Sequence, residues 1–165
     1  MTAKSTSPEI EDICRVTNRK RTAIFAGSFN PFTIGHASIV ERGLELFDHI
    51  VVTIGVNMNK AHGDAQRIAE AIGKQYSHDS RVSVIVWPGL MADLAKRLDV
   101  RFFLRGVRSM ADYEYERNMA DINRRLAGIE TVLLFALPEH GAVSSSVVRE
   151  LQSYGADVSE LLPKT

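Results

Sequence analysis

The chain has 165 residues, 45% hydrophobic and 24% charged, which is ordinary for one globular domain with a buried core. Twenty basic and twenty acidic residues give zero formal net charge, so no global electrostatic field favours nucleic acid or an anionic membrane as a partner. The single cysteine, Cys14, favours a reducing cytoplasm, the longest apolar run (132–137) is too short to span a membrane, and the first residues lack the apolar core of a signal peptide.

Residues 1–21 precede the first expected strand and are treated as an N-terminal extension. Ser5-Thr6-Ser7-Pro8 is typical of a helix start, and Ile10 and Ile13 would then lie on one side of a short helix. A loosely ordered tail or a cloning remnant is the alternative. The extension is assigned no chemistry, and residues 22–165 are expected to form a single domain.

The first expected strand is the apolar run 23–26, and the turn-forming residues of segment 27–35 follow it. Apolar residues then recur at helical spacing: Ala37, Val40, Leu44 and Phe47. His36 falls in the first turn of this helix, where free N–H groups and the positive end of the helix dipole favour a phosphate. The alternative for such a histidine is a surface or capping residue.

Strands and helices alternate along the rest of the chain. The further strands are expected at residues 50–56, 82–87, 102–104 and 131–137. The further helices are expected at residues 64–76, 91–98, 111–126, 144–151 and 158–162. The apolar stripe of the 111–126 helix comprises Tyr115, Met119, Ile122 and Leu126, and Gly128 ends that helix. The alternation predicts a doubly wound, Rossmann-like α/β domain with three layers and a five-stranded parallel sheet.

Ligands of such folds bind beyond the carboxyl ends of the strands. The residues expected there, in chain order, are Ser28, His36, Lys60, Met91, Arg105, Arg108, Ser144, Ser145 and Ser146. Most are phosphate-compatible, because arginine pairs bidentately with phosphate and a glycine such as Gly106 allows close backbone approach.

Each of these groups has a plainer alternative. The two arginines could be solvated surface residues, Lys60 an ordinary loop lysine, and the serines no more than a helix cap. Arg149, placed in the first turn of that helix, opposes the helix dipole unless an anion binds there. Glu116 could be an exposed carboxylate paired with Arg117 or Arg124.

Several chemistries have no support in the sequence. There is no Cys/His cluster for a metal, no nucleophile elbow, no Gly-x-Gly-x-x-Gly after the first strand and no Walker-type loop. Histidine, lysine and arginine facing phosphates, without a nucleophile or a metal cage, suggest direct phosphoryl or nucleotidyl transfer by positioning and charge stabilisation.

Gly27-Ser28-Phe29-Asn30-Pro31 followed by Thr33-Ile34-Gly35-His36 resembles the T/H-x-G-H signature of nucleotidyltransferases. Arg105-Gly106-Val107-Arg108, Asp112-Tyr113-Glu114-Tyr115-Glu116 and Val143-Ser144-Ser145-Ser146 make the likeness more specific. In this order the motifs resemble the bacterial phosphopantetheine adenylyltransferase family over about residues 21–163.

The resemblance implies reversible transfer of AMP from ATP, with Mg²⁺, to 4′-phosphopantetheine, giving dephospho-coenzyme A and pyrophosphate without a covalent intermediate. It also implies a cytoplasmic homohexamer that can bind coenzyme A as a feedback ligand. It gives catalytic roles to His36, Lys60 and Arg105, and acceptor contacts to Ser28, Lys60, Met91 and Arg105. The ATP site that it implies comprises Ser28, Phe29, His36, Gly106, Val107, Arg108, Glu116, His140, Gly141, Ala142, Val143, Ser144, Ser145 and Ser146. It implies no protein ligands for a resident metal.

The chain departs from the family pattern at Ser28, where threonine is commoner, and at Asn30, where aspartate is usual. Segment 60–66 is shorter than usual, and 140–142 lacks an aromatic residue. Two alternatives therefore stay open: a related transferase with another phosphate acceptor, and a non-catalytic sensor of coenzyme A or nucleotide.

Overall fold

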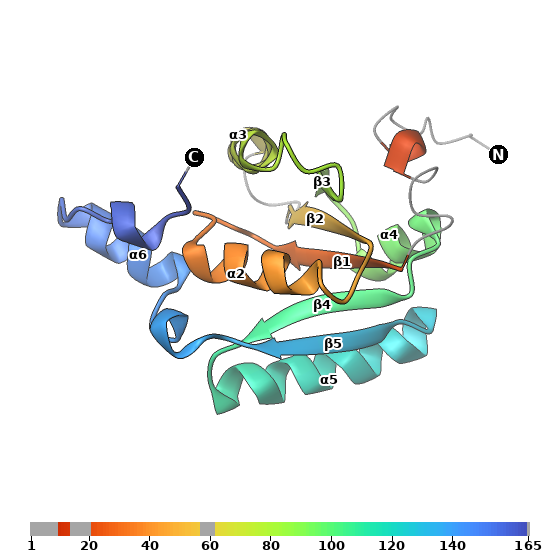
Figure 1. The fold of residues 1–165 in the computed structure, drawn as a ribbon. Coiled ribbons are helices and arrows are strands. Elements are labelled where there is room, and N and C mark those ends of the chain that lie inside the picture. Colours follow the sequence, from red (N-terminus) through yellow and green to blue (C-terminus); the bar gives the residue numbers. More distant parts are fainter. Residues whose placement is uncertain (1–9, 14–20, 57–61, 165) are drawn as a thin grey trace.

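The computed structural model describes residues 10–13, 21–56 and 62–164. Its centre is a five-stranded sheet in the order β3-β2-β1-β4-β5, with all neighbouring strands parallel (Figure 1). The strands are β1 (Thr22–Gly27), β2 (His49–Gly55), β3 (Val82–Trp87), β4 (Phe102–Val107) and β5 (Glu130–Phe135). The helices are α2 (Ile34–Gly43), α3 (His62–Gln75), α4 (Met91–Leu98), α5 (Met110–Ala127) and α6 (Ser145–Ser153). Short 3₁₀ turns lie at Pro138–His140 and Ser159–Leu161.

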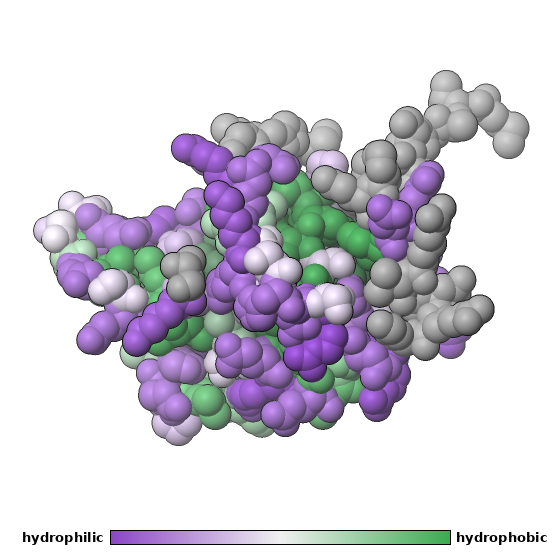
Figure 2. Space-filling view, turned by 45° about the horizontal axis from the view of Figure 1, so that its top comes forward, coloured by the Kyte–Doolittle hydropathy of each residue, from purple (hydrophilic) through white to green (hydrophobic). Residues whose placement is uncertain are grey.

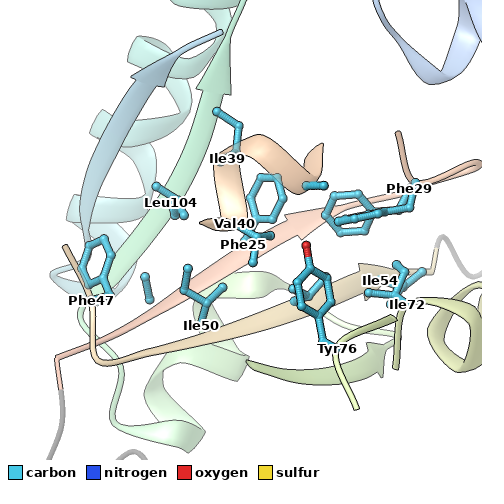
Figure 3. Packing of buried hydrophobic residues seen from close by; sticks show 14 of the residues in the cluster. Phe25, Phe29, Ile39, Val40, Phe47, Ile50, Ile54, Ile72, Tyr76 and Leu104 are labelled. Carbon is cyan, nitrogen blue, oxygen red and sulfur yellow. The ribbon is translucent and has the colours of Figure 1, made fainter. Parts of the chain in front are cut away.

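The sheet separates two apolar clusters, which confirms the predicted three-layer α/β fold. One cluster joins α2 and α3 to the sheet through residues such as Val40, Ile72 and Leu104 (Figure 3). The other joins α4 to the opposite face through residues such as Leu94 and Phe103. Alternating side chains of each strand supply the two faces, as the pleat requires.

Residues 10–13 are helical, and Ile10 and Ile13 are buried in the cluster beneath α4. This agrees with the helical interpretation of this part of the extension. The proposed helix start at Ser5-Thr6-Ser7-Pro8 lies outside the described residues.

Several boundaries differ from those predicted. α2 ends at Gly43 because the chain turns there, and Phe47, still buried, donates its backbone N–H to the Gly43 carbonyl at 2.8 Å. β4 extends to Val107 because its second half pairs with Leu133–Phe135, so Arg105 lies within the strand and not after it. β5 ends at Phe135, and the last predicted helix is a single 3₁₀ turn.

The apolar stripe predicted on α5 is not a core stripe. Tyr115, Ile122 and Leu126 are 61%, 47% and 53% exposed, respectively, and Glu116 is the buried residue of the helix. Gly128 caps the helix as predicted. No helix within the described ranges is both long and apolar enough to cross a membrane.

The strand order reverses between β1 and β4. From β1 the sheet grows through β2 to β3 in one direction, and through β4 to β5 in the other. The helices that follow β1 and β4 lie on opposite faces, which leaves a crevice beyond the carboxyl ends of these two strands. Ligands of such folds bind in this crevice.

Candidate active site

A cavity of about 400 Å³ opens beyond the carboxyl ends of β1 and β4. The predicted site residues that line it are Ser28, Phe29, His36, Arg105, Gly106, Val107, Arg108, Glu116, His140, Val143, Ser144, Ser145 and Ser146. Gly141 and Ala142 are not among its lining residues, Met91 lines an adjoining cavity, and Lys60 lies outside the described residues.

The turn after β1 is built around the ring of Phe29. This side chain is only 2% exposed and packs against Phe25, Phe32 and His36, with ring centroids 5.1–5.4 Å apart. A Cβ at Gly27 would lie 2.9 Å from the Phe29 ring, so this position requires glycine. Phe29 itself has a φ of 46°, a backbone conformation that bulky residues rarely adopt. A ligand in the cavity can therefore meet the Phe29 backbone but little of its ring.

His36 is fixed by a capping box at the start of α2. The Thr33 backbone N–H donates to His36 Nδ1 at 3.0 Å, and the His36 backbone N–H donates to Thr33 Oγ1 at 3.4 Å. Because Nδ1 accepts a hydrogen bond, the proton of the neutral ring is on Nε2. His36 thus offers the cavity an N–H donor of defined orientation.

Burial, followed by the positive charges of Arg108 and Arg105, lowers the pKa of His36 from 6.5 to about 4. The ring is therefore neutral at physiological pH when no anion is bound. The neutral ring keeps its Nε2–H, and this group can donate a hydrogen bond to a phosphate oxygen on which negative charge develops.

We expect no titration of His36 between pH 8 and pH 5.5 in the ligand-free protein, measured from its imidazole NMR signals. In the unfolded chain the ring binds a proton near pH 6.5, whereas the folded protein resists protonation down to about pH 4. The contribution of His36 to stability is thus complete above pH 6.5 and is lost as the pH falls from 6.5 to about 4. Unfolding of His36→Asn should show a shallower pH dependence there, and an unchanged slope would contradict the assignment.

Arg108 joins the end of β4 to the segment before α6. Its Nε donates to Asp112 Oδ2 at 3.1 Å, and its Nη1 donates to the Val143 carbonyl at 3.4 Å. Its side chain remains 40% exposed beside the cavity. The two contacts hold the guanidinium at the rim while leaving it accessible to an anion.

The start of α6 is fastened to the turn after β1. Ser144 is the N-cap, and Ser145 Oγ donates to the Pro31 carbonyl at 2.9 Å. Arg149 lies in the second turn, not in the first as predicted, and donates to the Asn30 carbonyl and to Ser146 Oγ. Asn30 therefore contacts Arg149 through its backbone carbonyl. This contact would be the same with aspartate, the usual residue of the family, at position 30.

A second cavity, of about 370 Å³, adjoins the first. Its apolar lining includes Leu90, Met91, Phe103, Met119, Ile122 and Leu126. Four residues line both cavities: Ala26, Arg105, Tyr115 and Glu116. An ion pair between Arg105 and Glu116 lies at this boundary, with Nη2 and Oε1 2.6 Å apart. The plainer alternative for Glu116, an exposed carboxylate paired with Arg117 or Arg124, is wrong, because Glu116 is buried and Arg124 pairs with Glu130.

Three residues that the structure brings into the site were not predicted to have a role there. Thr33 fixes the His36 ring, Asp112 holds Arg108, and Tyr115 borders both cavities. The first two could have been found: Thr33 is three residues before His36, as in a capping box, and Asp112 is four after Arg108, as in a helical ion pair.

The carboxylates lining the first cavity do not form a metal cage. Asp112 and Glu116 are each paired with an arginine. No group of three or more metal-binding side chains occurs among residues 10–13, 21–56 and 62–164. The cavity presents arginine, imidazole and helix N-termini, all of which can bind polyphosphate.

Comparisons with known proteins identify the family of this chain. Residues 24–151 match the model of the cytidylyltransferase-like family. The chain is 48% identical over 145 residues to a phosphopantetheine adenylyltransferase of Bacteroides fragilis, covering 87% of this chain and 97% of the relative. It is 46% identical over 145 residues to that of Bacteroides thetaiotaomicron, covering 87% and 96%.

Among solved structures, a lipopolysaccharide core biosynthesis protein from Thermoplasma volcanium matches with a TM-score of 0.52 at 16% identity, covering 72% of this chain and 97% of that one. At this identity the likeness supports the fold alone. The sequence matches are far closer and extend over nearly the whole of the curated relatives. The chain therefore belongs to the cytidylyltransferase-like nucleotidyltransferases and, among them, to the phosphopantetheine adenylyltransferase family.

Proposed function

We propose that this enzyme transfers the adenylyl group of ATP to 4′-phosphopantetheine, giving dephospho-coenzyme A and pyrophosphate. A phosphate oxygen of the acceptor attacks the α-phosphorus of ATP, and the bond from that phosphorus to the bridging oxygen of the leaving pyrophosphate breaks. The reaction needs no covalent enzyme intermediate. The observation that carries the proposal is the pair of adjoining cavities, which share Arg105 at their boundary.

The two cavities suit the two substrates. The first is lined by cationic and hydroxyl groups and lies at the starts of α2 and α6, which favours the nucleotide and its phosphates. The second is largely apolar, and Met91 at the start of α4 suits the flexible pantetheine arm. The acceptor phosphate then lies near Arg105, between the two.

The proposed roles follow from this placement. His36 donates through Nε2 to phosphate oxygens of ATP as charge develops on them. Ser28, exposed at the cavity, lies between the substrates, and its hydroxyl can serve in place of the usual threonine. Arg105, with Lys60, binds the acceptor phosphate. Of the other residues of the predicted ATP site, the Phe29 backbone, Gly106, Val107, Arg108 and segment 140–146 are proposed to bind ATP.

We propose that magnesium enters as the MgATP complex. Mg²⁺ commonly retains several waters and binds through substrate phosphates, so it does not require a dedicated set of carboxylates. The pairing of Asp112 and Glu116 with arginines is consistent with this mode of binding.

A homohexamer with coenzyme A as a feedback ligand, located in the cytoplasm, completes the proposal. Large hydrophobic residues are exposed at the end of β5 and on α6: Phe135 is 70% exposed, Val147 40% and Leu151 36%. Figure 2 shows a face on which hydrophobic residues are exposed between hydrophilic ones. Such residues favour association between copies. Light scattering coupled to gel filtration tests the oligomer, and a single-copy mass would contradict it.

The activity is tested by incubating the purified protein with MgATP and 4′-phosphopantetheine and separating the products. We expect dephospho-coenzyme A and pyrophosphate in equal amounts. Nicotinamide mononucleotide as acceptor and CTP as donor are the controls, and a preference for either would favour the related-transferase alternative. Binding of both substrates without turnover would favour a sensor.

A further inference from the structure

In α5 a charged residue is buried while large apolar residues are exposed. The helix exposes Tyr115 and Ile122, yet its carboxylate at Glu116 is only 7% exposed. A buried carboxylate is costly unless it is paired and hydrogen-bonded. Glu116 meets this requirement through Arg105. The helix is thus placed so that one acidic side chain reaches one arginine.

The contacts of Arg105 define which of its donors stay available. Its Nε donates to both Glu116 oxygens at 2.9 Å, its Nη2 donates to Glu116 Oε1 at 2.6 Å, and its Nη1 donates to the Ala26 carbonyl. Each terminal nitrogen carries two hydrogens. Within the described part of the chain, one N–H on Nη1 and one on Nη2 therefore remain for a ligand.

Two N–H groups on adjacent nitrogens match a phosphate bidentately. Glu116 holds the guanidinium through Nε and Nη2, and the Ala26 carbonyl holds Nη1, so the guanidinium cannot rotate without breaking these bonds. Arg105 is only 28% exposed, and both Arg105 and Glu116 line both cavities. The free donors are thus fixed at the boundary where the acceptor phosphate must lie.

We propose that Glu116 is a positioning residue that fixes Arg105 as a two-point donor for the phosphate of the acceptor, and that it does not contact the nucleotide. This departs from the role in the ATP site that the family resemblance implies for Glu116. The proposal rests on the proposed adenylyl transfer, because it identifies the acceptor phosphate as the anion that Arg105 binds.

The test is steady-state kinetics of Glu116→Gln. The amide presents one acceptor oxygen and turns an N–H₂ group towards the Arg105 donors, so the guanidinium loses its orientation while the side-chain volume is kept. We expect the KM for 4′-phosphopantetheine to rise about 10- to 100-fold. The KM for MgATP should change by less than about threefold. Glu116→Asp, which keeps the charge, should recover part of the loss.

A double-mutant cycle with Arg105→Ala separates positioning from direct contact. If Glu116 acts through Arg105, Glu116→Gln should have almost no further effect in the Arg105→Ala background. A raised KM for MgATP that persists in this background would overturn the proposal. Calorimetric binding of 4′-phosphopantetheine and of MgATP gives the same comparison for variants whose turnover is too slow to measure.

Glu130→Gln is the matched control, because it removes the exposed α5 ion pair with Arg124, which is not part of either cavity. It should leave both KM values unchanged. Thermal unfolding of every variant identifies those that fail to fold. Absence of dephospho-coenzyme A with the unmodified enzyme would refute the proposed function itself, whereas normal product formation with an ATP-specific defect in Glu116→Gln would refute only the positioning role.

Discussion

His36→Ala is expected to lower kcat by about 10²- to 10³-fold while the dissociation constant for MgATP changes by less than about threefold. The structure supplies the reason: Thr33 holds Nδ1, which leaves a neutral Nε2–H as the donor to the cavity. Such a donor gains strength as charge develops on the phosphate oxygens in the transition state. It contributes less to the ground state, so rate is lost more than affinity.

Single-turnover rates and calorimetry measure these two quantities separately. His78→Ala, which alters an exposed histidine outside both cavities, is the matched control and should behave like the unmodified enzyme. His36→Gln is informative because its amide can offer an N–H in place of Nε2, and it should recover part of the rate. Equal losses of affinity and rate in His36→Ala would mean that His36 acts in the ground state.

The sequence predicted the layers of this fold because strand and helix periodicities are local properties. Runs such as 50–56 and 82–87 are apolar on both faces, as buried parallel strands must be. Because the carboxyl ends of parallel strands meet on one edge of a sheet, the sequence also predicted that His36, Arg105 and Ser144 share a site. The order of the strands follows from packing and was not predicted from the chain.

The predicted ends of α2 and β4 were wrong because contacts between residues distant in the sequence determine them. The spacing of Leu44 and Phe47 continues the helical pattern of α2, yet the helix ends at Gly43 and Phe47 is buried after a turn. Arg105 was predicted to follow the strand 102–104, because a charged residue is rare inside a central strand. Pairing with β5 extends the strand through Arg105, and Glu116 makes the charge tolerable.

In the site, too, contacts between residues close in the sequence could be predicted, and contacts that depend on packing could not. Thr33 and Asp112 were recoverable from spacings of three and four residues. The pairing of Arg105 with Glu116 was not, because the distance between them depends on how α5 lies against β4. Phe29, which the family resemblance places in the ATP site, does line the first cavity, but its ring is part of the core, and the sequence did not predict that burial.

Leu104→Ala is expected to lower the free energy of unfolding by about 2–5 kcal/mol, the usual cost of truncating a fully buried leucine. Leu104 has no exposed surface and packs between β4 and α2, where its Cδ2 would lie 2.5 Å from a Cβ added at Gly43 (Figure 3). Its neighbours there include Gly43 of α2 and Ile50 of β2, both buried, so the surroundings can collapse little into the vacated volume. Urea unfolding should show a lower midpoint with an unchanged m-value.

Leu46→Ala, at a residue 45% exposed, is the control and should change stability by less than about 1 kcal/mol. Leu104 precedes Arg105 but faces the α2 cluster, while Arg105 contacts α5 from the other side of the sheet. Truncating Leu104 should therefore leave both KM values close to normal in the fraction of molecules that remains folded. A large rise in the KM for 4′-phosphopantetheine at temperatures well below unfolding would show instead that core packing under β4, and not Glu116 alone, determines the position of Arg105.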